Sequence, residues 1–307
     1  MRTVSVHIVT YNSANDIIDC LDGVFKQSYP IQQIIVVDNA SHDNIREVLQ
    51  PYNDRVHIIF NTENLGFAPG HNQAMRISQA DYFLVLNPDV TLDREYVARL
   101  VNSSEQNPKI GSATGRLLLK SNPHIIDSTG LVMNRARRAF DRGAGEPSDL
   151  WNGSGEVFGV SGAAALYSRD MVEDISIEGQ FYDESFFAYK EDVDVAWRAQ
   201  NYGWISYYNA DAIAYHERGW KKGSRNQQPL FIRQYSYINR YKMIYKNDSR
   251  RNLFRNLIQI LPFEIASVGY ALLRDPKVLR SWVSFYRELP ALRHKKNIIQ
   301  NKTNSDI

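Results

Sequence analysis

Four short apolar segments near the start of the chain limit its fold more than any other feature of the sequence. Strand patterns occupy residues 4–10, 34–38, 57–60 and 82–87, and helical patterns occupy residues 14–27 and 70–79. Apolar strands that alternate with helices predict a mostly parallel sheet with helices on both faces. Ligands of such sheets bind at the carboxyl ends of the strands, so the polar residues there are candidates for a site.

The length and composition allow one large domain with a helical extension, or two small domains. Hydrophobic residues make up 43% of the 307 residues, which is ordinary for a globular protein. The single cysteine, Cys20, excludes an intrachain disulfide, and we expect it to be buried. No uninterrupted apolar run reaches the ~18–20 residues of a membrane span, and residues 4–9 have a strand pattern rather than that of a signal peptide. A cytoplasmic protein is therefore expected.

Charge is distributed unevenly along the chain. Residues 1–217 hold 17 Lys and Arg against 29 Asp and Glu, whereas residues 218–302 hold 19 against 4. The last third is therefore predicted to present a basic surface to something anionic. Within it, residues 277–289 have the pattern of a basic amphipathic helix with a Trp. Such a helix either lies in a membrane interface or docks on the rest of the protein.

The middle of the chain, residues 111–216, is less regular. The basic, glycine-bearing segment 135–145 is predicted to be an exposed and mobile loop, and small side chains fill residues 159–165. A helix is expected to begin near Glu191, and from Gln228 onward the pattern is helical.

Asn87, Pro88 and Asp89 follow an apolar strand and are predicted to lie at the ligand edge of the sheet. A departing nucleotide diphosphate carries adjacent negative charges, which a divalent metal held by one or two carboxylates neutralises. His216 also follows a strand and could complete a metal site through an imidazole nitrogen. Each has an ordinary alternative, a turn for residues 87–89 and a structural role for His216.

Two further segments have features of a nucleotide site. Asp38 ends the second strand and can accept hydrogen bonds from a base or ribose, the alternative being a solvated strand end. Residues 64–72 place two glycines before a helix, where backbone N–H groups can approach a phosphate, the alternative being a plain loop. The segment lacks the Gly-Lys-Ser/Thr of a P-loop. No Gly-x-Gly-x-x-Gly follows the first strand, which argues against a nicotinamide-dependent dehydrogenase.

Three carboxylates crowd the predicted helix start at residues 191–194, where the helix dipole tolerates negative charge. Direct transfer of a sugar to an alcohol needs a base for the hydroxyl proton, and we assign that role to Asp192. Asp194 and Arg198 are interpreted as a structural pair four residues apart on one helix face.

The order of these motifs resembles the family 2 inverting glycosyltransferases of the GT-A fold, above all bacterial rhamnosyltransferase-like members. The matching segments are VTYNS (9–13), VVDNAS (36–41), NTENLGFAPGHNQA (61–74), LNPDV (86–90), GVSGAAALYSRD (159–170), FFAYKEDVDVAWR (186–198) and YHERG (215–219). The resemblance implies an α/β GT-A domain over residues 1–220, with a nucleotide-sugar part at 1–110 and an acceptor and catalytic part at 111–220. A helical, basic extension would follow at 221–307.

The resemblance also implies a role for each motif residue. The nucleotide sugar would be bound by Thr10, Tyr11, Asn12, Asp38, Asn39, Asn64, Gly66, Asn72 and Asn87. Asp89 and His216 would bind Mn²⁺ or Mg²⁺, and Asn87 replaces the first carboxylate of the family's Asp-x-Asp pattern. Asp192 would be the catalytic base. The acceptor side would include Gly162, Ala163 and Glu191.

The implied reaction is a single displacement with inversion at the anomeric carbon. The segments ENLGF, NPD and KEDVD favour dTDP-L-rhamnose as donor, and a UDP-hexose is the alternative. The acceptor would be a saccharide, free or linked to a polyprenyl diphosphate. The basic C-terminal third would meet an anionic membrane surface. These expectations place the protein at the inner face of the cell membrane, in synthesis of a cell-surface polysaccharide such as O-antigen or cell wall. An oligomer is neither required nor excluded.

Two other functions were weighed against this one. A nucleotidyltransferase needs a basic, glycine-rich loop after the first strand, where residues 11–15 read YNSAN. A saccharide- or nucleic-acid-binding protein could use the tyrosines of the basic tail, namely Tyr235, Tyr237, Tyr241 and Tyr245. We expect no nucleic-acid partner, because the tail contains no known module and the acidic N-terminal part would repel a polyanion.

Overall fold

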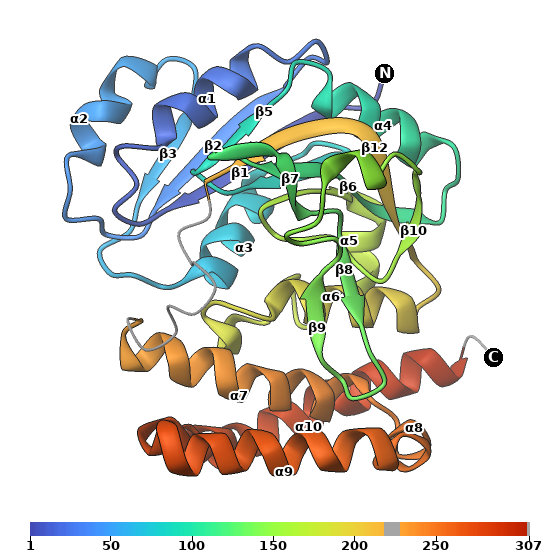
Figure 1. Cartoon of the computed structure of the whole chain (residues 1–307). Coiled ribbons are helices and arrows are strands. Elements are labelled where there is room, and N and C mark those ends of the chain that lie inside the picture. Colours follow the sequence, from blue (N-terminus) through green and yellow to red (C-terminus); the bar gives the residue numbers. More distant parts are fainter. Residues whose placement is uncertain (218–227, 306–307) are drawn as a thin grey trace.

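The computed structural model describes residues 1–217 and 228–305, and one large sheet forms its centre (Figure 1). β1 (Val4–Thr10), β2 (Gln33–Asp38), β3 (His57–Phe60) and β4 (Tyr82–Leu86) run parallel in the order β3-β2-β1-β4. The four predicted strands are confirmed to within one residue at each end. Because the strands are parallel, their carboxyl ends meet at one edge of the sheet.

Beyond β4 the sheet is mixed. β11 (Ala164–Ser168) lies antiparallel between β4 and β6 (Ile110–Leu119), and β12 (Ile205–His216) runs parallel to β6. The other strands pair antiparallel, namely β5 (Val90–Leu92) and β10 (Gly155–Val157) with β12, and β7 (Asn122–Ser128) with β6. Antiparallel neighbours need no crossover helix, which accounts for the less regular sequence of this region. The start of β11 therefore lies beside the end of β4.

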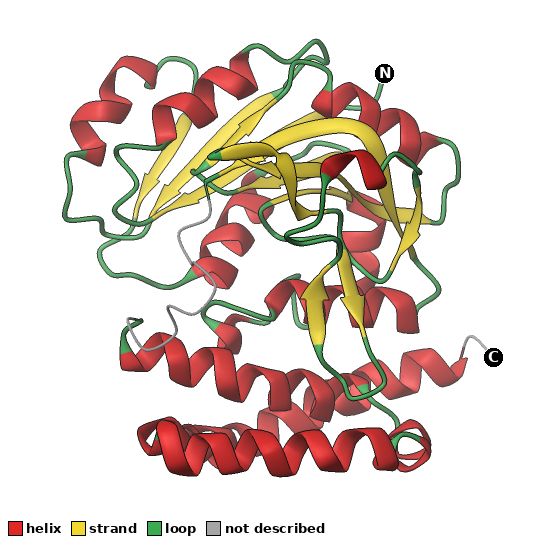
Figure 2. Ribbon diagram, viewed as in Figure 1, coloured by secondary structure: helices red, strands yellow, loops and turns green. Residues whose placement is uncertain are grey.

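Helices cover both faces of the sheet (Figure 2). One face packs against α1 (Ile17–Phe25), α2 (Ile45–Leu49) and α4 (Tyr96–Glu105), and the other against α3 (Phe67–Ile77), α5 (Arg169–Ile175) and α6 (Glu191–Asn201). Leu84 and Leu86 of β4 belong to the first core and Phe83 and Val85 to the second, as alternation along a strand requires. Cys20 is buried, as expected. Short 3₁₀ turns are η1 (Gln50–Tyr52), η2 (Ser148–Leu150) and η3 (Glu184–Phe186).

The prediction of an exposed loop at residues 135–145 is wrong in part, because a hairpin forms there. β8 (Leu131–Met133) pairs antiparallel with β9 (Ala139–Asp141), and the hairpin reaches toward the C-terminal helices (Figure 1). Arg137 at its tip places Nε 2.6 Å from Asp248 Oδ2, and Arg138 lies over the ring of Phe263. These partners are distant in the chain, so a local sequence pattern does not reveal them.

The C-terminal part is helical, as predicted. It consists of α7 (Leu230–Asn247), α8 (Arg250–Arg255), α9 (Leu257–Arg274), the 3₁₀ turn η5 (Pro276–Arg280) and α10 (Ser281–Ser305). The amphipathic stretch 277–289 is divided between η5 and α10. Its buried residues Val278 and Phe285 pack against Tyr237 and Ile238 of α7. Of the two expectations for this stretch, docking on the protein is therefore the one observed. The predicted boundary at residues 220 and 221 lies outside the described residues.

A buried network of charges ties α7 and α10 to the rest of the protein. Lys246 of α7 is fully buried, and its Nζ lies 2.5 Å from Asp183 Oδ2 and 2.9 Å from Asp194 Oδ2. Arg198 Nε lies 3.2 Å from Asp194 Oδ2, so the predicted pair on α6 exists. Lys295 of α10 lies 2.7 Å from Asp183 Oδ1. Although burial opposes ionisation, Lys246 and Lys295 lower the pKa of Asp183 well below its usual value.

We predict that Lys246→Met destabilises the protein by about 3–5 kcal/mol, because it leaves buried carboxylates without their cation. Urea unfolding would measure the change. Lys26→Met is the matched control, because Lys26 makes an exposed ion pair with Asp22 at 3.6 Å. We expect this control to change the free energy of unfolding by less than about 1 kcal/mol. Equal effects of the two variants would show that the buried network does not hold the helices.

Candidate functional site

A buried carboxylate joins the carboxyl ends of β1 and β2. Asp38 is 1% exposed, and its Oδ1 accepts hydrogen bonds from Thr10 Oγ1 (3.1 Å) and Ser41 Oγ (2.5 Å). The backbone N–H of Ser41 donates to the other carboxylate oxygen. Thr10 and Asp38 therefore shape the strand ends, whereas Tyr11 and Asn12 are exposed and accessible to a ligand.

Both strand ends carry a residue in the left-handed backbone region. Asn12 has φ 54° and Ala40 has φ 57°. The turn is held because Asn12 N–H donates to Ser41 Oγ and Asn12 Oδ1 accepts from His42 N–H, both at 2.8 Å. Non-glycine residues seldom adopt this conformation, and backbone strain of this kind concentrates at functional sites.

Asparagines connect β2 and β3 to the glycine loop. Asn39 Nδ2 donates to Gly66 O, and Asn39 Oδ1 accepts from Asn61 Nδ2, both at 2.9 Å. Asn64 Oδ1 accepts from Gly66 N–H at 2.9 Å. Gly66 has φ 95°, and a Cβ there would lie 2.6 Å from the backbone oxygen of Phe187. Only glycine fits this position, and the backbone that it approaches in the structure is the segment before α6.

Asn72, predicted among the nucleotide-binding residues, has a different environment. It is 2% exposed on α3. Its Nδ2 donates to Tyr182 O (2.8 Å) and Glu184 Oε1 (3.0 Å), and its Oδ1 accepts from Tyr182 N–H (3.0 Å). Because the amide is committed to the segment 182–184, we assign Asn72 a structural role at the site.

Asp89 and His216 lie side by side at the same sheet edge. His216 Nε2 is 3.3 Å from Asp89 Oδ1, and His216 Nδ1 is 2.7 Å from Asp127 Oδ2. The backbone N–H of Glu217 also donates to Asp89 O at 3.0 Å, which fixes the end of β12 against the 87–89 turn. Although burial opposes protonation, the carboxylates of Asp127 and Asp89 raise the pKa of His216 to about 9.

Residues predicted for the acceptor side lie next to this turn. Asn87 N–H donates to Ala163 O at 2.9 Å, because the end of β4 borders the start of β11. The N–H of the neighbouring Gly162 lies 3.4 Å from Asp192 Oδ2. A Cβ on Gly162 would come within 3.8 Å of Asp192 Cβ and 3.2 Å of Phe67. A short chain of contacts therefore links the Asp89 turn to Asp192.

The two adjacent carboxyls at the start of α6 both have raised pKa values. Burial, with Asp192 alongside, raises the pKa of Glu191 to about 8, so this carboxyl is uncharged at neutral pH. Burial also raises the pKa of Asp192, while Lys190 and the N–H groups of Val193 and Gly162 oppose the rise. A carboxylate with a raised pKa is a stronger base than an ordinary aspartate.

The segment before α6 is held in a strained conformation by α7. Phe187, Tyr189 and Lys190 have φ angles of 59°, 70° and 72°. Asn239 of α7 is fully buried, and its Nδ2 lies 2.8–3.0 Å from three carbonyl oxygens, those of Phe186, Ala188 and Tyr189. One side chain therefore fixes the backbone that leads into Asp192. We call residues 183–190 the α7-bound segment.

The sequence profile described as Glycosyl transferase family 2 matches residues 5–176, which is more than half of the chain. The chain belongs to glycosyl transferase family 2. The predicted family is thereby confirmed, and the assignment supports the prediction of a glycosyltransferase enzyme.

Curated relatives include poly-beta-1,6-N-acetyl-D-glucosamine synthases. The protein of Staphylococcus aureus is 24% identical over 217 residues, which cover 70% of this chain and 50% of the relative. That of Staphylococcus epidermidis is 21% identical over 214 residues, covering 69% and 49%. The chain thus spans about half the length of the curated relatives that it matches.

Solved structures confirm the GT-A glycosyltransferase fold of this family 2 member. The mannosyltransferase PcManGT of Pyrobaculum calidifontis, in complex with GDP-Man and Mn²⁺, aligns with a TM-score of 0.59 and 17% identity, covering 99% of this chain and 88% of that one. TarS 1-349 of S. aureus in complex with UDP aligns with a TM-score of 0.55 and 15% identity, covering 92% and 78%. At these identities the likeness shows the fold alone.

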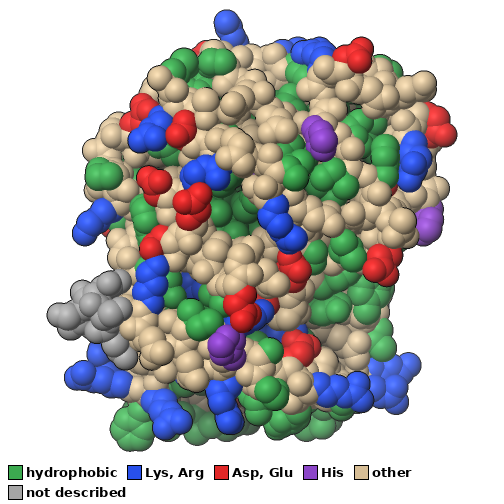
Figure 3. All heavy atoms as spheres, turned by 180° about the vertical axis from the view of Figure 1, so that it is seen from behind, with side chains coloured by type: hydrophobic (Ala, Val, Ile, Leu, Met, Phe, Trp, Pro, Cys, Tyr) green, Lys and Arg blue, Asp and Glu red, His purple; other side chains and the backbone are tan. Residues whose placement is uncertain are grey.

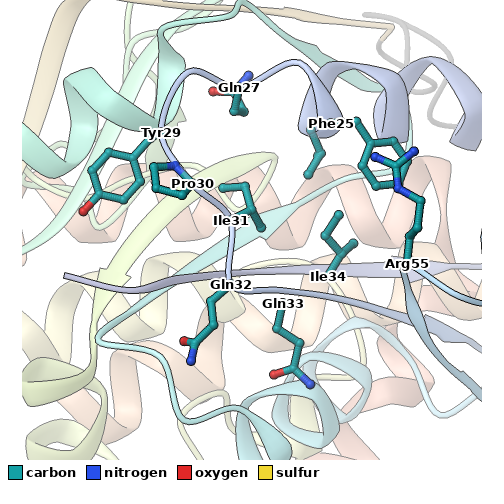
Figure 4. A pocket seen from close by; sticks show the side chains of 10 residues that line it. Phe25, Gln27, Tyr29, Pro30, Ile31, Gln32, Gln33, Ile34 and Arg55 are labelled. Carbon is teal, nitrogen blue, oxygen red and sulfur yellow. The ribbon is translucent and has the colours of Figure 1, made fainter. Parts of the chain in front are cut away.

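A separate hollow lies beside the connection from α1 to β2 (Figure 4). It encloses about 330 Å³ and is lined by residues around the connection from α1 to β2, with Arg55 lying 3.6 Å over the ring of Phe25. This connection enters β2 at its amino end, whereas the predicted site residues after β1, β2 and β4 lie at the carboxyl ends. The hollow is therefore not part of the candidate site.

Sequence reasoning missed Asp127 and the α7 residues that hold the α7-bound segment. Asp127 follows two isoleucines in β7. An acidic residue directly after an apolar pair was the only feature of the sequence that could have indicated it. Asn239, Lys242 and Lys246 recur at spacings of three and four on one face of α7. Such a polar stripe is usually interpreted as a solvated surface, because lysine is seldom buried.

We predict that Asn239→Leu speeds hydrogen exchange at the amides of residues 186–190, because three buried carbonyls lose their donor. Global stability should fall by about 1–3 kcal/mol. Exchange measured by mass spectrometry, peptide by peptide, tests this. Asn252→Leu on the exposed side of α8 is the matched control and should leave that exchange unchanged. Unaltered exchange in Asn239→Leu would remove its assigned role.

Proposed function

We propose that this chain is an inverting glycosyltransferase that moves a sugar from a nucleotide diphosphate to an acceptor hydroxyl. One observation carries the proposal: the Asp89–His216 pair and Asp192 are linked through Asn87, Ala163 and Gly162 at one sheet edge. Leaving-group stabilisation and proton removal require separate groups that reach the same substrate. The family 2 assignment supports this reading.

We propose a Mn²⁺ or Mg²⁺ ion at Asp89 and His216, where it would neutralise the diphosphate as it leaves. The residues present fit such an ion. Two ligand atoms, each ~2.1 Å from one ion at adjacent coordination positions, lie roughly 3 Å apart. Asp89 Oδ1 and His216 Nε2 are 3.3 Å apart. If His216 Nδ1–H donates to Asp127, the free lone pair of Nε2 faces Asp89, as in many metal sites.

The protein supplies few ligands for this ion. Among residues 1–217 and 228–305, no group of three His, Cys, Asp or Glu side chains has the arrangement of a metal site. Mg²⁺ sites commonly use one or two protein ligands, with phosphate oxygens and waters completing the shell. The ion would therefore bind best together with the donor. Asn87 replaces a carboxylate here, so the protein offers one charged ligand fewer and the donor phosphates would be needed to hold the ion.

Asp192 would accept the proton of the acceptor hydroxyl. As the acceptor oxygen bonds to the anomeric carbon, the bond from that carbon to the diphosphate oxygen breaks, and the configuration inverts. Tyr11, Asn12, Asn39, Asn64, Gly66 and Asn87 would border the nucleotide sugar, with Thr10 and Asp38 supporting the strand ends. The uncharged Glu191, Gly162 and Ala163 would line the acceptor side.

For the donor we propose dTDP-L-rhamnose, supported by residues 63–67, 87–89 and 190–194, and we keep a UDP-hexose as the alternative. The acceptor would be a saccharide, free or linked to a polyprenyl diphosphate, in synthesis of a cell-surface polysaccharide. The curated relatives are poly-beta-1,6-N-acetyl-D-glucosamine synthases, which supports a role in a polysaccharide pathway. We place the enzyme at the inner face of the cell membrane.

Asp192→Asn is expected to lower kcat by at least about 10²–10⁴-fold, because the amide cannot accept the proton. Donor binding, measured by thermal shift, should persist. Glu191→Gln is the matched comparison: Glu191 is uncharged at neutral pH, so a much smaller loss is expected. In the wild type, kcat/KM should rise with pH as Asp192 ionises, with its acid limb above the usual pKa of an aspartate. Turnover by Asp192→Asn at the wild-type rate would exclude Asp192 as the base.

When the protein is mixed separately with each nucleotide sugar of a panel, we expect one donor to raise its Tm. The rise should be larger with Mn²⁺ than without it. A ligand at ~100 times its Kd adds about 2.7 kcal/mol to stability. Asp89→Asn should remove the metal-dependent part, and Asp54→Asn, at an exposed position, should not. Because metal competes with the His216 proton, the metal-dependent shift should grow as pH rises toward about 9. A shift of equal size in Asp89→Asn would refute the metal site.

A further inference from the structure

The outer side of α8 and α9 presents a continuous apolar surface. Nine large apolar side chains there are 37–84% exposed: Phe254, Leu257, Ile258, Leu261, Ile265, Val268, Tyr270, Leu272 and Leu273. Ile258, Leu261, Ile265, Val268 and Leu272 recur at spacings of three and four, which places them on one face of the helix. We call these nine residues the α9 face. A surface of this extent on a helix indicates a partner.

The opposite side of α9 is fixed to the protein. Glu264 Oε1 lies 2.6 Å from Arg240 Nη1, and Tyr241 donates to Glu264 Oε2 at 2.7 Å. Ala271 is buried against Tyr237 and Val278. By length and composition α9 could cross a bilayer, yet a crossing helix would have to abandon this ion pair and packing. In the structure α9 lies along α7 (Figure 1).

Exposed cations stand at both ends of the α9 face. Arg250 and Arg251 precede it, Arg255 lies between its first two residues, and Arg274, Lys277 and Arg280 follow it. The acids of this stretch face inward, Glu264 toward Arg240 and Asp275 toward Arg233, whose Nη1 lies 2.6 Å from Asp275 Oδ2. Figure 3 shows apolar side chains along the lower edge of the molecule, with Lys and Arg on both sides.

We propose that the α9 face docks on an anionic lipid bilayer, with α9 lying in the headgroup region parallel to the membrane. An apolar helical face between basic ends is the arrangement that binds such surfaces. Each Lys or Arg near the surface is attracted to anionic lipid. A second copy of the chain is a poorer occupant, because a symmetric interface would bring six cations toward six others. This surface differs from residues 277–289, where Val278 and Phe285 are buried against α7.

The position of the site adds a consequence that rests on the proposed function. α7 lies between the α9 face and the α7-bound segment, which it holds through Asn239 and Lys242. Lys242 Nζ lies 2.8 Å from Ser185 O. In a docked enzyme, α7 alone would therefore separate the start of α6, which carries Asp192, from the helix that lies in the lipid headgroups. An acceptor saccharide carried by a membrane lipid would then be within reach.

Vesicle co-sedimentation without donor or acceptor tests the docking independently of catalysis. Wild type should bind vesicles of equal parts phosphatidylglycerol and phosphatidylcholine at least about tenfold better than pure phosphatidylcholine, and added salt should weaken binding. The triple variant Ile258→Ser, Ile265→Ser, Leu272→Ser should bind at least about tenfold less. Replacing Arg250, Arg251 and Arg255 by Gln should remove most of the preference for anionic lipid.

The matched control replaces exposed apolar residues elsewhere, Ile18, Ile77 and Leu150, by Ser, and should bind vesicles like wild type. Circular dichroism and the donor-dependent Tm shift of each variant establish that the fold and the site are intact. Vesicle binding by the α9-face triple variant equal to wild type would overturn the proposal. So would failure of the wild type to bind, or self-association of the wild type that the triple variant abolishes.

Discussion

The position of the proposed base depends on a lysine ammonium enclosed between two carboxylates. Lys246 has no exposed surface and joins α7 to Asp183, ahead of η3, and to Asp194, in the first turn of α6. Bringing these charges out of water is favourable only because each has an opposite charge within hydrogen-bonding distance. Once α7 is held there, Asn239 and Lys242 meet the carbonyl groups of the α7-bound segment. The orientation of α6, and with it Asp192, is thus set by a helix outside the sheet.

The sequence predicted the sheet, and it also indicated most residues of the candidate site, because both follow short-range rules. Alternation with helices gave β1 to β4, and polar strand ends gave Asp89 and the Asp38 turn. The resemblance to a family added Gly162 beside Asp192. The residues that the sequence did not indicate depend on partners far apart in the chain. Asp127 becomes informative only when β7 brings it to His216, and Asn239 only when α7 crosses the segment before α6. In the same way, residues 277–289 and 254–273 have similar apolar patterns. Tertiary packing alone decides that Val278 and Phe285 of the first are buried, whereas in the second Ala271 alone is buried.

The two parts of the site differ in electrostatics. Around His216 the carboxylates of Asp127 and Asp89 favour a positive charge, which a cation could replace. Around α6 the burial of Glu191 favours a neutral carboxyl next to Asp192. A neutral neighbour limits repulsion between adjacent acids, which favours the charged form of Asp192. Of the strained residues, Phe187, Tyr189 and Lys190 precede α6, whereas Asn12 and Ala40 follow the ends of β1 and β2. Their conformations are maintained by side chains from other elements.

The contact of Gly66 with the Phe187 backbone limits how this protein can be altered. The glycine loop and the α7-bound segment touch without an intervening side chain, and Ala68 N–H also donates to Phe187 O at 3.2 Å. Grafting a loop from another enzyme at residues 61–70 would therefore collide with residues 186–190 unless those were exchanged too. In chimaeras built from this chain, the two segments form one exchangeable unit, together with the stretch of α7 that Asn239 occupies.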